Sequence, residues 1–187
     1  MGEKSIRVSR SPYDIELHQH RFAAWAAGRA ASVKGCRFSV AQGRYILERS
    51  FISKLSKPEQ LPRSRDVDAM HRQWRNRVIA VAKRHNLKFT DGVAAKLINV
   101  YLKCRFVCGG HHGHENVRNL HPPIDDVLLK TLAEQNYGGF AKYWRDARKK
   151  RWSKLNAEEY EGVIRRIREA LKGEPLWTIE EYWKGNQ

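Results

Sequence analysis

Two charged residues lie where the sequence predicts apolar helices to begin. Lys96 belongs to DGVAAKLINVYLK, a segment that is apolar on nearly every side, and Asp125 belongs to HPPIDDVLL, directly after a proline pair. A lysine near a helix N-terminus opposes the helix dipole, whereas an aspartate there complements the dipole or caps free N–H groups. Lys96 is therefore either a snorkelling surface lysine or a desolvated amine with a depressed pKa, which is how an amine becomes a nucleophile. Asp125 is either a helix cap or a functional carboxylate.

Charge is the strongest signal in the overall composition. The 187 residues include 36 Lys and Arg against 20 Asp and Glu, which gives a formal net charge of +16 at pH 7 and a pI near 10.1. Such a surface attracts phosphate polymers, so we expect a nucleic acid as the partner. An anionic membrane surface, or no polyanionic partner at all, is the alternative. Hydrophobic residues make up 41% of the chain, which is enough for a stable core.

The sequence lacks the usual signals of secretion and membrane insertion. No apolar run reaches transmembrane length, and the opening MGEKSIRVSR has no apolar signal-peptide core. The three cysteines are an odd number, which argues against a disulfide framework. We expect a cytoplasmic, monomeric protein with no membrane partner and no cofactor.

Helical patterns dominate the chain, and no stretch alternates with period two, so we expect an all-α fold of seven or so helices. Capping pairs mark three of the helix starts. These pairs are Ser39 with Gln42, Asn156 with Glu159, and Thr178 with Glu181, while Thr90 or Asp91 can cap the central apolar helix. The helices are expected over residues 13–33, 39–48, 66–86, 92–107, 122–133 with proline near the first turn, 156–173 and 178–185, with a Gly- and His-rich loop, CGGHHGHENVRNL, after the fourth.

The segments around Lys96 and Asp125 resemble motifs of one enzyme family. GVAAK, which ends at Lys96, resembles the G-V-G-x-K hairpin of helix-hairpin-helix DNA glycosylases, and PIDDVLL resembles the P-V-D-x-x-V segment of that superfamily. The order also matches: hairpin, apolar helix, loop, then an aspartate at a helix start. Ala94 replaces the second hairpin glycine, and Asp91 replaces the usual proline before the first. No four-cysteine motif follows, which excludes the iron–sulfur branches, and the resemblance covers roughly residues 70–130.

The resemblance implies a compact all-α fold of two packed helical halves, with a helix-hairpin-helix-like element and no iron–sulfur cluster. After an N-terminal tail at residues 1–10, a single glycosylase-like domain spans residues 11–187. Residues 63–135 form its hairpin and catalytic half, and residues 11–62 and 136–187 pack together as the other half.

The resemblance also implies an activity, that of a DNA glycosylase of the oxoguanine-glycosylase-like branch. Such an enzyme flips a modified or damaged base out of the DNA and cleaves the N-glycosidic bond, which leaves an abasic site. Asp125 matches the carboxylate that stabilises the oxocarbenium-like transition state, and Lys96 matches the Schiff-base lysine of members that are also lyases. Asp126 is a backup for Asp125, but a helix turns it about 100° away, so the two cannot face one sugar.

Contacts to double-stranded DNA are expected from three regions. The hairpin would bind backbone phosphate through N–H groups at a helix start, and two basic segments would add phosphate contacts unless they form a solvated basic face. The flipped base would stack on and hydrogen-bond to the side chains of a pocket. The candidates are Gly92, Val93 and Ala94 for the hairpin, Arg63, Arg65, Lys149, Lys150 and Arg151 for the basic segments, and Trp25, His18, His20, His111 and His112 for the base pocket.

A cluster of cysteines and histidines overlaps the end of the apolar helix. Thiolates and imidazoles suit zinc, but the spacing here matches no zinc module, and buried free cysteines are common on apolar helices. We therefore expect no metal, and instead a loop that forms a lip beside Asp125. The cluster consists of Cys104, Cys108, His111, His112, His114 and His121.

Three other functions stay open at this point. They are a non-catalytic basic helical DNA-binding protein, an RNA- or ribosome-associated helical protein, and a metal-dependent nuclease built on the cysteine and histidine cluster. For the glycosylase, the substrate is double-stranded DNA that carries either an oxidised purine or a bulky modified pyrimidine such as some phage genomes contain. Its role is accordingly base-excision repair or defence against phage DNA.

Overall fold

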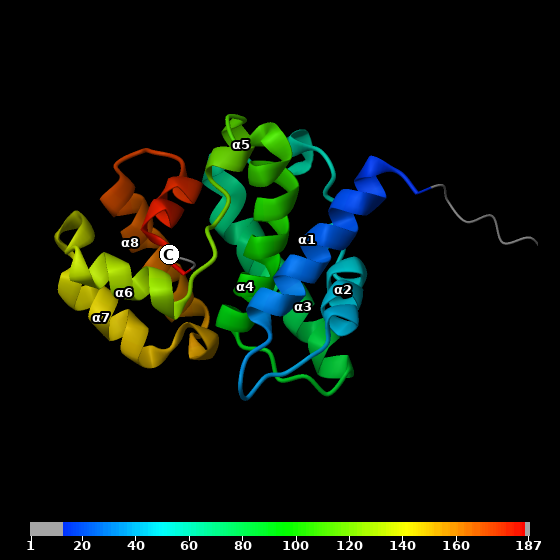
Figure 1. The fold of residues 1–187 in the computed structure, drawn as a ribbon, viewed down its shortest axis with the longest axis horizontal. Helices are drawn as coiled ribbons and strands as arrows, with labels where there is room; N and C mark the ends of the chain where they lie inside the picture. Colours follow the sequence, from blue (N-terminus) through cyan, green and yellow to red (C-terminus); the bar gives the residue numbers. More distant parts are fainter. Residues whose placement is uncertain (1–12, 186–187) are drawn as a thin grey trace, which may run out of the picture.

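The computed structural model describes residues 13–185, so the tail expected at residues 1–10 lies outside the described residues. Eight α-helices, one π-helix and several short 3-10 helices make up this part of the chain (Figure 1). Apart from an isolated bridge between Val33 and Cys36, residues 13–185 contain no β-structure, and the expected all-α class is confirmed. The α-helices are α1 (Ile15–Ala31), α2 (Val40–Arg49), α3 (Val67–Arg84), α4 (Asp91–Leu102), α5 (Glu115–Arg118), α6 (Asp126–Glu134), α7 (Ala141–Lys150) and α8 (Ala157–Leu171).

Side-chain caps begin three helices where the sequence predicts them. Ser39 and Gln42, and likewise Asn156 and Glu159, form capping boxes in which side chain and backbone bond to each other reciprocally. Thr90 caps α4 through its hydroxyl, which accepts a backbone N–H of the first turn. Each cap satisfies an N–H group that has no partner inside its helix.

Of the two other predicted starts, one is wrong. Pro122 and Pro123 directly precede the Asp125 cap of α6, so proline lies near its first turn as predicted. Thr178 caps no helix, because its hydroxyl donates to the Pro175 carbonyl oxygen at 2.7 Å. The C-terminal element is a 3-10 helix, η7 (Leu176–Tyr182), which begins directly after Pro175.

The predicted Gly- and His-rich loop is largely helical. α4 continues without a break into the π-helix η4 (Lys103–His111), and α5 follows shortly after. Gly110, with φ of 89°, occupies the left-handed region near the end of η4 and turns the chain there.

Two hydrophobic clusters form the core. The first runs from Ala23 to Leu120 and is built by α1 to α5, and the second runs from Ile124 to Ile179, includes Ala95, and is built by α6 to α8 with η7. Figure 1 shows α6, α7 and α8 together on one side and α1 to α4 on the other. Residues 137–182 thus share a hydrophobic cluster with their sequence neighbour α6.

Helix α4 lies at the centre, as its all-round apolarity predicts. Ten of its twelve residues are buried, and it packs against α1, α3, α8 and the short 3-10 helix η6 (Trp152–Lys154). Ala95 belongs to the second hydrophobic cluster, whereas its neighbours Ala94 and Leu97 belong to the first. Lys96 is therefore held where the two clusters meet.

A buried chain of hydrogen bonds ties α4 and α8 to the segment that leads into α6. Asn99 donates from Nδ2 to the Pro122 carbonyl oxygen at 2.9 Å and to the Tyr160 hydroxyl at 3.0 Å. The Tyr160 hydroxyl lies 3.0 Å from His121 Nδ1, and His121 Nε2 lies 2.8 Å from Asp68 Oδ1. Because Tyr160 accepts from Asn99 and Asp68 can only accept, this chain assigns His121 the neutral tautomer with its proton on Nε2.

A second buried histidine extends the chain. His71 Nε2 lies 2.7 Å from Asn99 Oδ1, and His71 Nδ1 lies 2.9 Å from the fully buried guanidinium of Arg75. Burial is the largest effect on both imidazoles and lowers the pKa of His71 and of His121, although Asp68 opposes it at His121. Both histidines are therefore neutral in the folded protein at neutral pH.

We expect the free energy of unfolding to fall as the pH drops below the ordinary histidine pKa of 6.5. In the unfolded chain His71 and His121 take up protons that the folded protein does not bind, and each favours unfolding by up to about 1.4 kcal/mol per pH unit. In His71→Gln this dependence should be shallower. Urea unfolding at about pH 7 and about pH 5.5 measures it, with His85→Gln, at an exposed histidine, as the control. A wild-type dependence in His71→Gln would contradict this interpretation.

A candidate active site at the start of two helices

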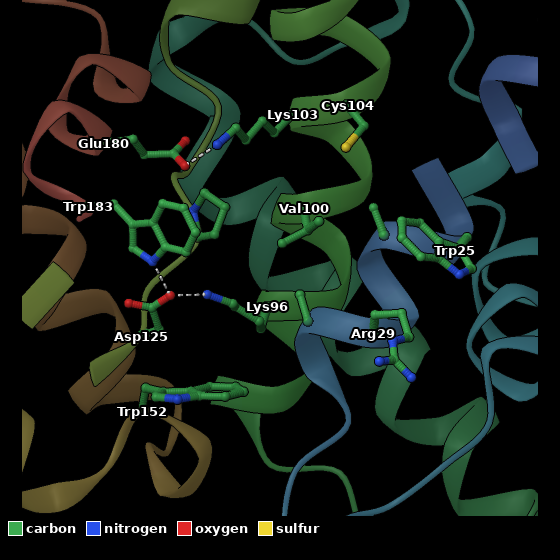
Figure 2. Close-up of a pocket in the computed structure, with 13 residues that line it drawn as sticks. Trp25, Arg29, Lys96, Val100, Lys103, Cys104, Asp125, Trp152, Glu180 and Trp183 are labelled. Carbon is green, nitrogen blue, oxygen red and sulfur yellow. Dashed lines mark hydrogen bonds and ion pairs between the residues drawn. The ribbon is translucent and has the colours of Figure 1, made fainter. Parts of the chain in front are cut away.

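A cavity of about 650 Å³ opens beside Lys96, at the junction of the two hydrophobic clusters. Pockets of this size hold drug-sized ligands and cofactors. Figure 2 shows its lining, which comes from α1, α4, the start of η4, the segment before α6, the short helices η6 and η7, and Trp183 directly after η7. The polar and aromatic lining residues are Trp25, Arg29, Lys96, Lys103, Asp125, Trp152, Glu180 and Trp183.

The structure brings Lys96 and Asp125 together. Lys96 Nζ donates to Asp125 Oδ2 at 2.9 Å, and the exposed fractions of the two side chains are only 7% and 18%. Lys96 lies in the second turn of α4 rather than in the first, since that helix begins at Asp91. Its amine does not snorkel to solvent but ends in the cavity against a carboxylate.

Asp125 is both a helix cap and a pocket residue. Its Oδ1 accepts the Leu128 N–H at 2.9 Å, which makes it the N-cap of α6. Its Oδ2 accepts from Lys96 and also from Trp183 Nε1 at 2.8 Å. The two interpretations of Asp125 from sequence, a helix cap and a functional carboxylate, are therefore compatible, because Oδ1 caps the helix and Oδ2 faces the cavity.

Burial sets the electrostatics of the cavity. It lowers the pKa of Lys96, and the neighbouring charge and hydrogen bond of Asp125 offset only part of this effect. The Lys96 ammonium also lies 5.5 Å from the centroid of the Trp152 ring. Glu180 pairs with Lys103 on the adjoining wall, and burial raises the pKa of Glu180. Lys96 thus loses its proton closer to neutral pH than an ordinary lysine does.

Two tryptophans enclose the ion pair. In Figure 2 the indole of Trp183 and that of Trp152 lie on opposite sides of Asp125 and Lys96. Trp25 and Arg29 of α1 form the facing wall, on the far side of Lys96 and Val100. A flat ligand that enters this space meets aromatic surface, one amine and one carboxylate.

The hairpin residues do not offer phosphate-binding N–H groups, so that prediction is wrong. Gly92, Val93 and Ala94 are buried, and their N–H groups donate to the Leu155 carbonyl oxygen at 3.1 Å and to the side chain and backbone of Thr90. Asp91, at the same helix start, binds the Arg75 guanidinium at 2.9 Å instead of facing solvent. The α4 N-terminus is thus covered by protein, since η6 and the following residues lie across it.

The basic candidates lie on the surface outside the cavity. Arg65, Lys149 and Lys150 pair with Asp66 at 3.5 Å, with Asp146 at 3.6 Å and with Glu159 at 2.7 Å, respectively. Arg63 and Arg151 are also exposed. Asp126 does not line the cavity and binds Arg148 through both carboxylate oxygens, at 2.8 and 3.0 Å.

Of the five base-pocket candidates, the structure places one at the cavity. Trp25 lines it, whereas His18 bonds to the Tyr13 hydroxyl at 2.6 Å. His20 lies 2.9 Å from the Tyr101 hydroxyl and 3.1 Å from Glu48. His111 lies against Phe106, and His112 packs edge-on against Trp177 with ring centroids 5.8 Å apart.

The cysteine and histidine cluster is dispersed in the fold. Within residues 13–185, no three side chains of His, Cys, Asp or Glu are arranged to hold a metal ion. Cys104 reaches the cavity wall, where burial raises the pKa of its thiol to about 11, and Cys108 is exposed. His114 caps α5. The expected histidine lip beside Asp125 is not formed.

Sequence reasoning missed most of the cavity walls. Trp152, Trp183 and Glu180 reach it from segments remote from Lys96, and only tertiary structure brings them there. Lys103 was detectable, because it lies seven positions after Lys96 on the same face of one helix. Arg29 was detectable in the same way, four positions after Trp25.

Comparisons with protein-family models, with curated proteins and with solved structures give no significant match to this chain. Within residues 13–185, none of the helices combines the length and the apolarity that crossing a bilayer requires. The geometry of the cavity therefore carries the functional argument.

Replacing Lys96 should reveal its lowered pKa as a pH-dependent difference in stability. Between the folded-state pKa of Lys96 and 10.5, the unfolded chain holds a proton that the folded protein lacks, so wild-type stability rises with pH in this window. Lys96→Met lacks this contribution. As the pH rises, the free energy of unfolding of the wild type should therefore increase by up to about 1.4 kcal/mol per pH unit relative to that of Lys96→Met.

Urea unfolding of both proteins at about pH 7 and about pH 9.5 measures this difference. Lys142→Met, at an exposed lysine of α7, is the matched control and should track the wild type at both pH values. A constant difference between wild type and Lys96→Met across this range would show that Lys96 titrates normally.

Proposed function

We propose that the protein is a DNA glycosylase that excises a modified or damaged base from DNA and also has lyase activity. The observation that carries this proposal is the Lys96 amine at 2.9 Å from the Asp125 carboxylate, in a cavity walled by tryptophans. The pairing links the two residues whose flanking sequences resemble separate motifs of helix-hairpin-helix glycosylases. The basic surface, with its formal charge of +16, supports a nucleic acid substrate.

In the proposed reaction the neutral Lys96 amine attacks C1′ of the deoxyribose, and the C1′–N bond breaks with its electron pair leaving on the base. The base takes up a proton, and the newly cationic amine gives one up, for which Asp125 Oδ2 is the acceptor already bonded to it. The C1′–O4′ bond then breaks, O4′ takes up the proton that Asp125 had accepted, and the C1′=N bond of the Schiff base forms. Loss of a proton from C2′ then expels the 3′ phosphate, which cleaves the strand. Asp125 also stabilises the positive charge that develops on the sugar.

The cavity also suits an extruded base. Enzymes that act on a base in duplex DNA flip it into a pocket, where it stacks between apolar or aromatic side chains. Trp152 and Trp183 offer such faces on either side of the reacting pair, and Trp183 would exchange its bond to Asp125 for contact with the substrate. An oxidised purine and a bulky modified pyrimidine are both candidates for this space, which corresponds to a role in repair or in defence against phage DNA.

The DNA contacts proposed here fall on exposed basic residues. Arg65, Lys149 and Lys150 are held by surface carboxylates, and such pairs contribute only about 0–1 kcal/mol, so a phosphate can replace the carboxylate. Arg63 and Arg151 would add to the same contacts. Helices α3 and α4, with the connection between them, are the proposed helix-hairpin-helix-like element.

Base release from a panel of duplexes that carry different modified bases tests the proposal. Wild type should release at least one base, and Asp125→Asn should lose this activity by about 100-fold or more, because the stabilising carboxylate is gone. Asp126→Asn is the matched control: it changes the adjacent residue, which binds Arg148 outside the cavity, and should retain wild-type release. Lys96→Gln should lose strand nicking.

The outcomes separate the alternatives. Wild-type protein that binds every duplex, including modified phage DNA, and releases nothing would favour a non-catalytic DNA-binding protein. Equal loss of activity in Asp125→Asn and Asp126→Asn would mean that the acidic pair acts through helix α6 rather than through the cavity. Circular dichroism and DNA binding of each variant show whether it is folded.

Borohydride trapping should report the pKa of Lys96 in the reaction. Only the neutral amine attacks C1′, so the yield of trapped protein–DNA complex should rise with pH through the lowered pKa of Lys96. The midpoint of this rise should lie below pH 10.5, the pKa of an ordinary lysine. Lys96→Gln should give no trapped complex at any pH. A rise that begins only near pH 10 would contradict a desolvated nucleophile.

A further inference from the structure

Helix α1 carries an exposed stripe of side chains that its packing leaves uncovered. Ile15, His18, Phe22, Trp25 and Arg29 recur at alternating spacings of three and four, so they share one face of the helix, and all five are exposed. Phe22 is 57% and Trp25 52% exposed. The opposite face, made of small residues, is buried against α2 and α4.

The C-terminal end of this α1 stripe leads into the candidate active site. Trp25 and Arg29 line the cavity that holds Lys96 and Asp125, as Figure 2 shows. Phe22 continues the aromatic surface outward, with its ring centroid 6.0 Å from that of Trp25. Aromatic surface is therefore continuous from the cavity to the outside of the molecule.

The chemistry of the stripe favours one kind of partner. Exposed aromatic side chains beside a cation form the platform on which unpaired nucleotides bind, because each base has a face that can stack and each phosphate a charge that can pair. Arg29 supplies the cation at the cavity end, and the exposed Lys34 and Arg37 follow α1 along the chain. The acidic residues of the helix, Asp14 and Glu16, lie at its other end.

We propose that Phe22, Trp25 and Arg29 bind unpaired nucleotides adjacent to the base held in the cavity. This inference rests on the proposed function, since it places the rest of the locally opened strand next to the excised base. The two aromatic rings stack on successive bases, and Arg29, at the cavity end of the stripe, contacts the phosphate that links these bases to the base in the cavity. The stripe thereby holds open the DNA from which a base has been extruded.

Binding of a fluorescein-labelled oligothymidine tests the inference without any need for base release. Phe22→Ala and Trp25→Ala should each weaken binding about tenfold or more, which is the scale of a lost base–aromatic stack. Phe22→Trp keeps an aromatic face and should bind like the wild type. Tyr45→Ala removes a 41% exposed aromatic side chain from α2, outside the stripe, and should leave affinity unchanged.

Other results overturn the inference. Unchanged oligothymidine affinity in both alanine variants would do so, as would an equal loss in Tyr45→Ala. If the alanine variants instead lose self-association or binding to phosphatidylserine vesicles while they retain DNA affinity, the stripe docks a second copy of the chain or a membrane.

Two results distinguish a failure of the stripe proposal from a failure of the proposed glycosylase function. Wild type that releases bases while the alanine variants bind oligothymidine normally would refute the stripe and leave the glycosylase intact. Wild type that binds oligothymidine through Phe22 and Trp25 but releases no base would refute the glycosylase activity and leave the nucleotide-binding stripe intact.

Discussion

The side-chain amide of Asn99 is the interaction on which the candidate site depends. It lies between the two hydrophobic clusters and is bonded to Pro122, to Tyr160 and to His71. An amide buried to this extent is costly unless every bond is made, so the arrangement of its partners is narrowly specified. Pro122 stands three positions before Asp125, and Asn99 stands three after Lys96. The same amide thereby fixes the distance between amine and carboxylate.

The buried lysine shows how the fold tolerates an expensive group. A lone ammonium in this position would be strongly destabilised, and the Asp125 carboxylate compensates only in part, which is why burial still dominates the pKa of Lys96. Asp125 itself is immobilised by capping α6. Asp125 thus stabilises α6 through Oδ1 and holds the Lys96 amine in the cavity through Oδ2.

The sequence predicts the elements better than their arrangement. Helical periodicity and capping pairs identify α2, α3, α4 and α8, because these signals are local. The motif resemblance singled out Lys96 and Asp125 but not the bond between them. Trp152, Trp183 and Glu180 could not be found, since their positions depend on how η6 and η7 pack. The hairpin N–H groups were misjudged for two reasons. Leu155 reaches Gly92 only in the tertiary structure, whereas the Thr90 cap, which the sequence itself predicts, already accepts the next two N–H groups.

The absence of a side chain at Gly92 lets η6 lie close across the start of α4. A methyl group on Gly92 would come within 1.8 Å of the Trp152 carbonyl oxygen, so η6 can cross the start of α4 only over a glycine. Trp152 forms the wall beside the Lys96 ammonium. Any larger residue at position 92 would push that indole outward or unseat η6. A shift of η6 would therefore move the Trp152 wall of the cavity, while Lys96 and Asp125, which belong to other elements, keep their places.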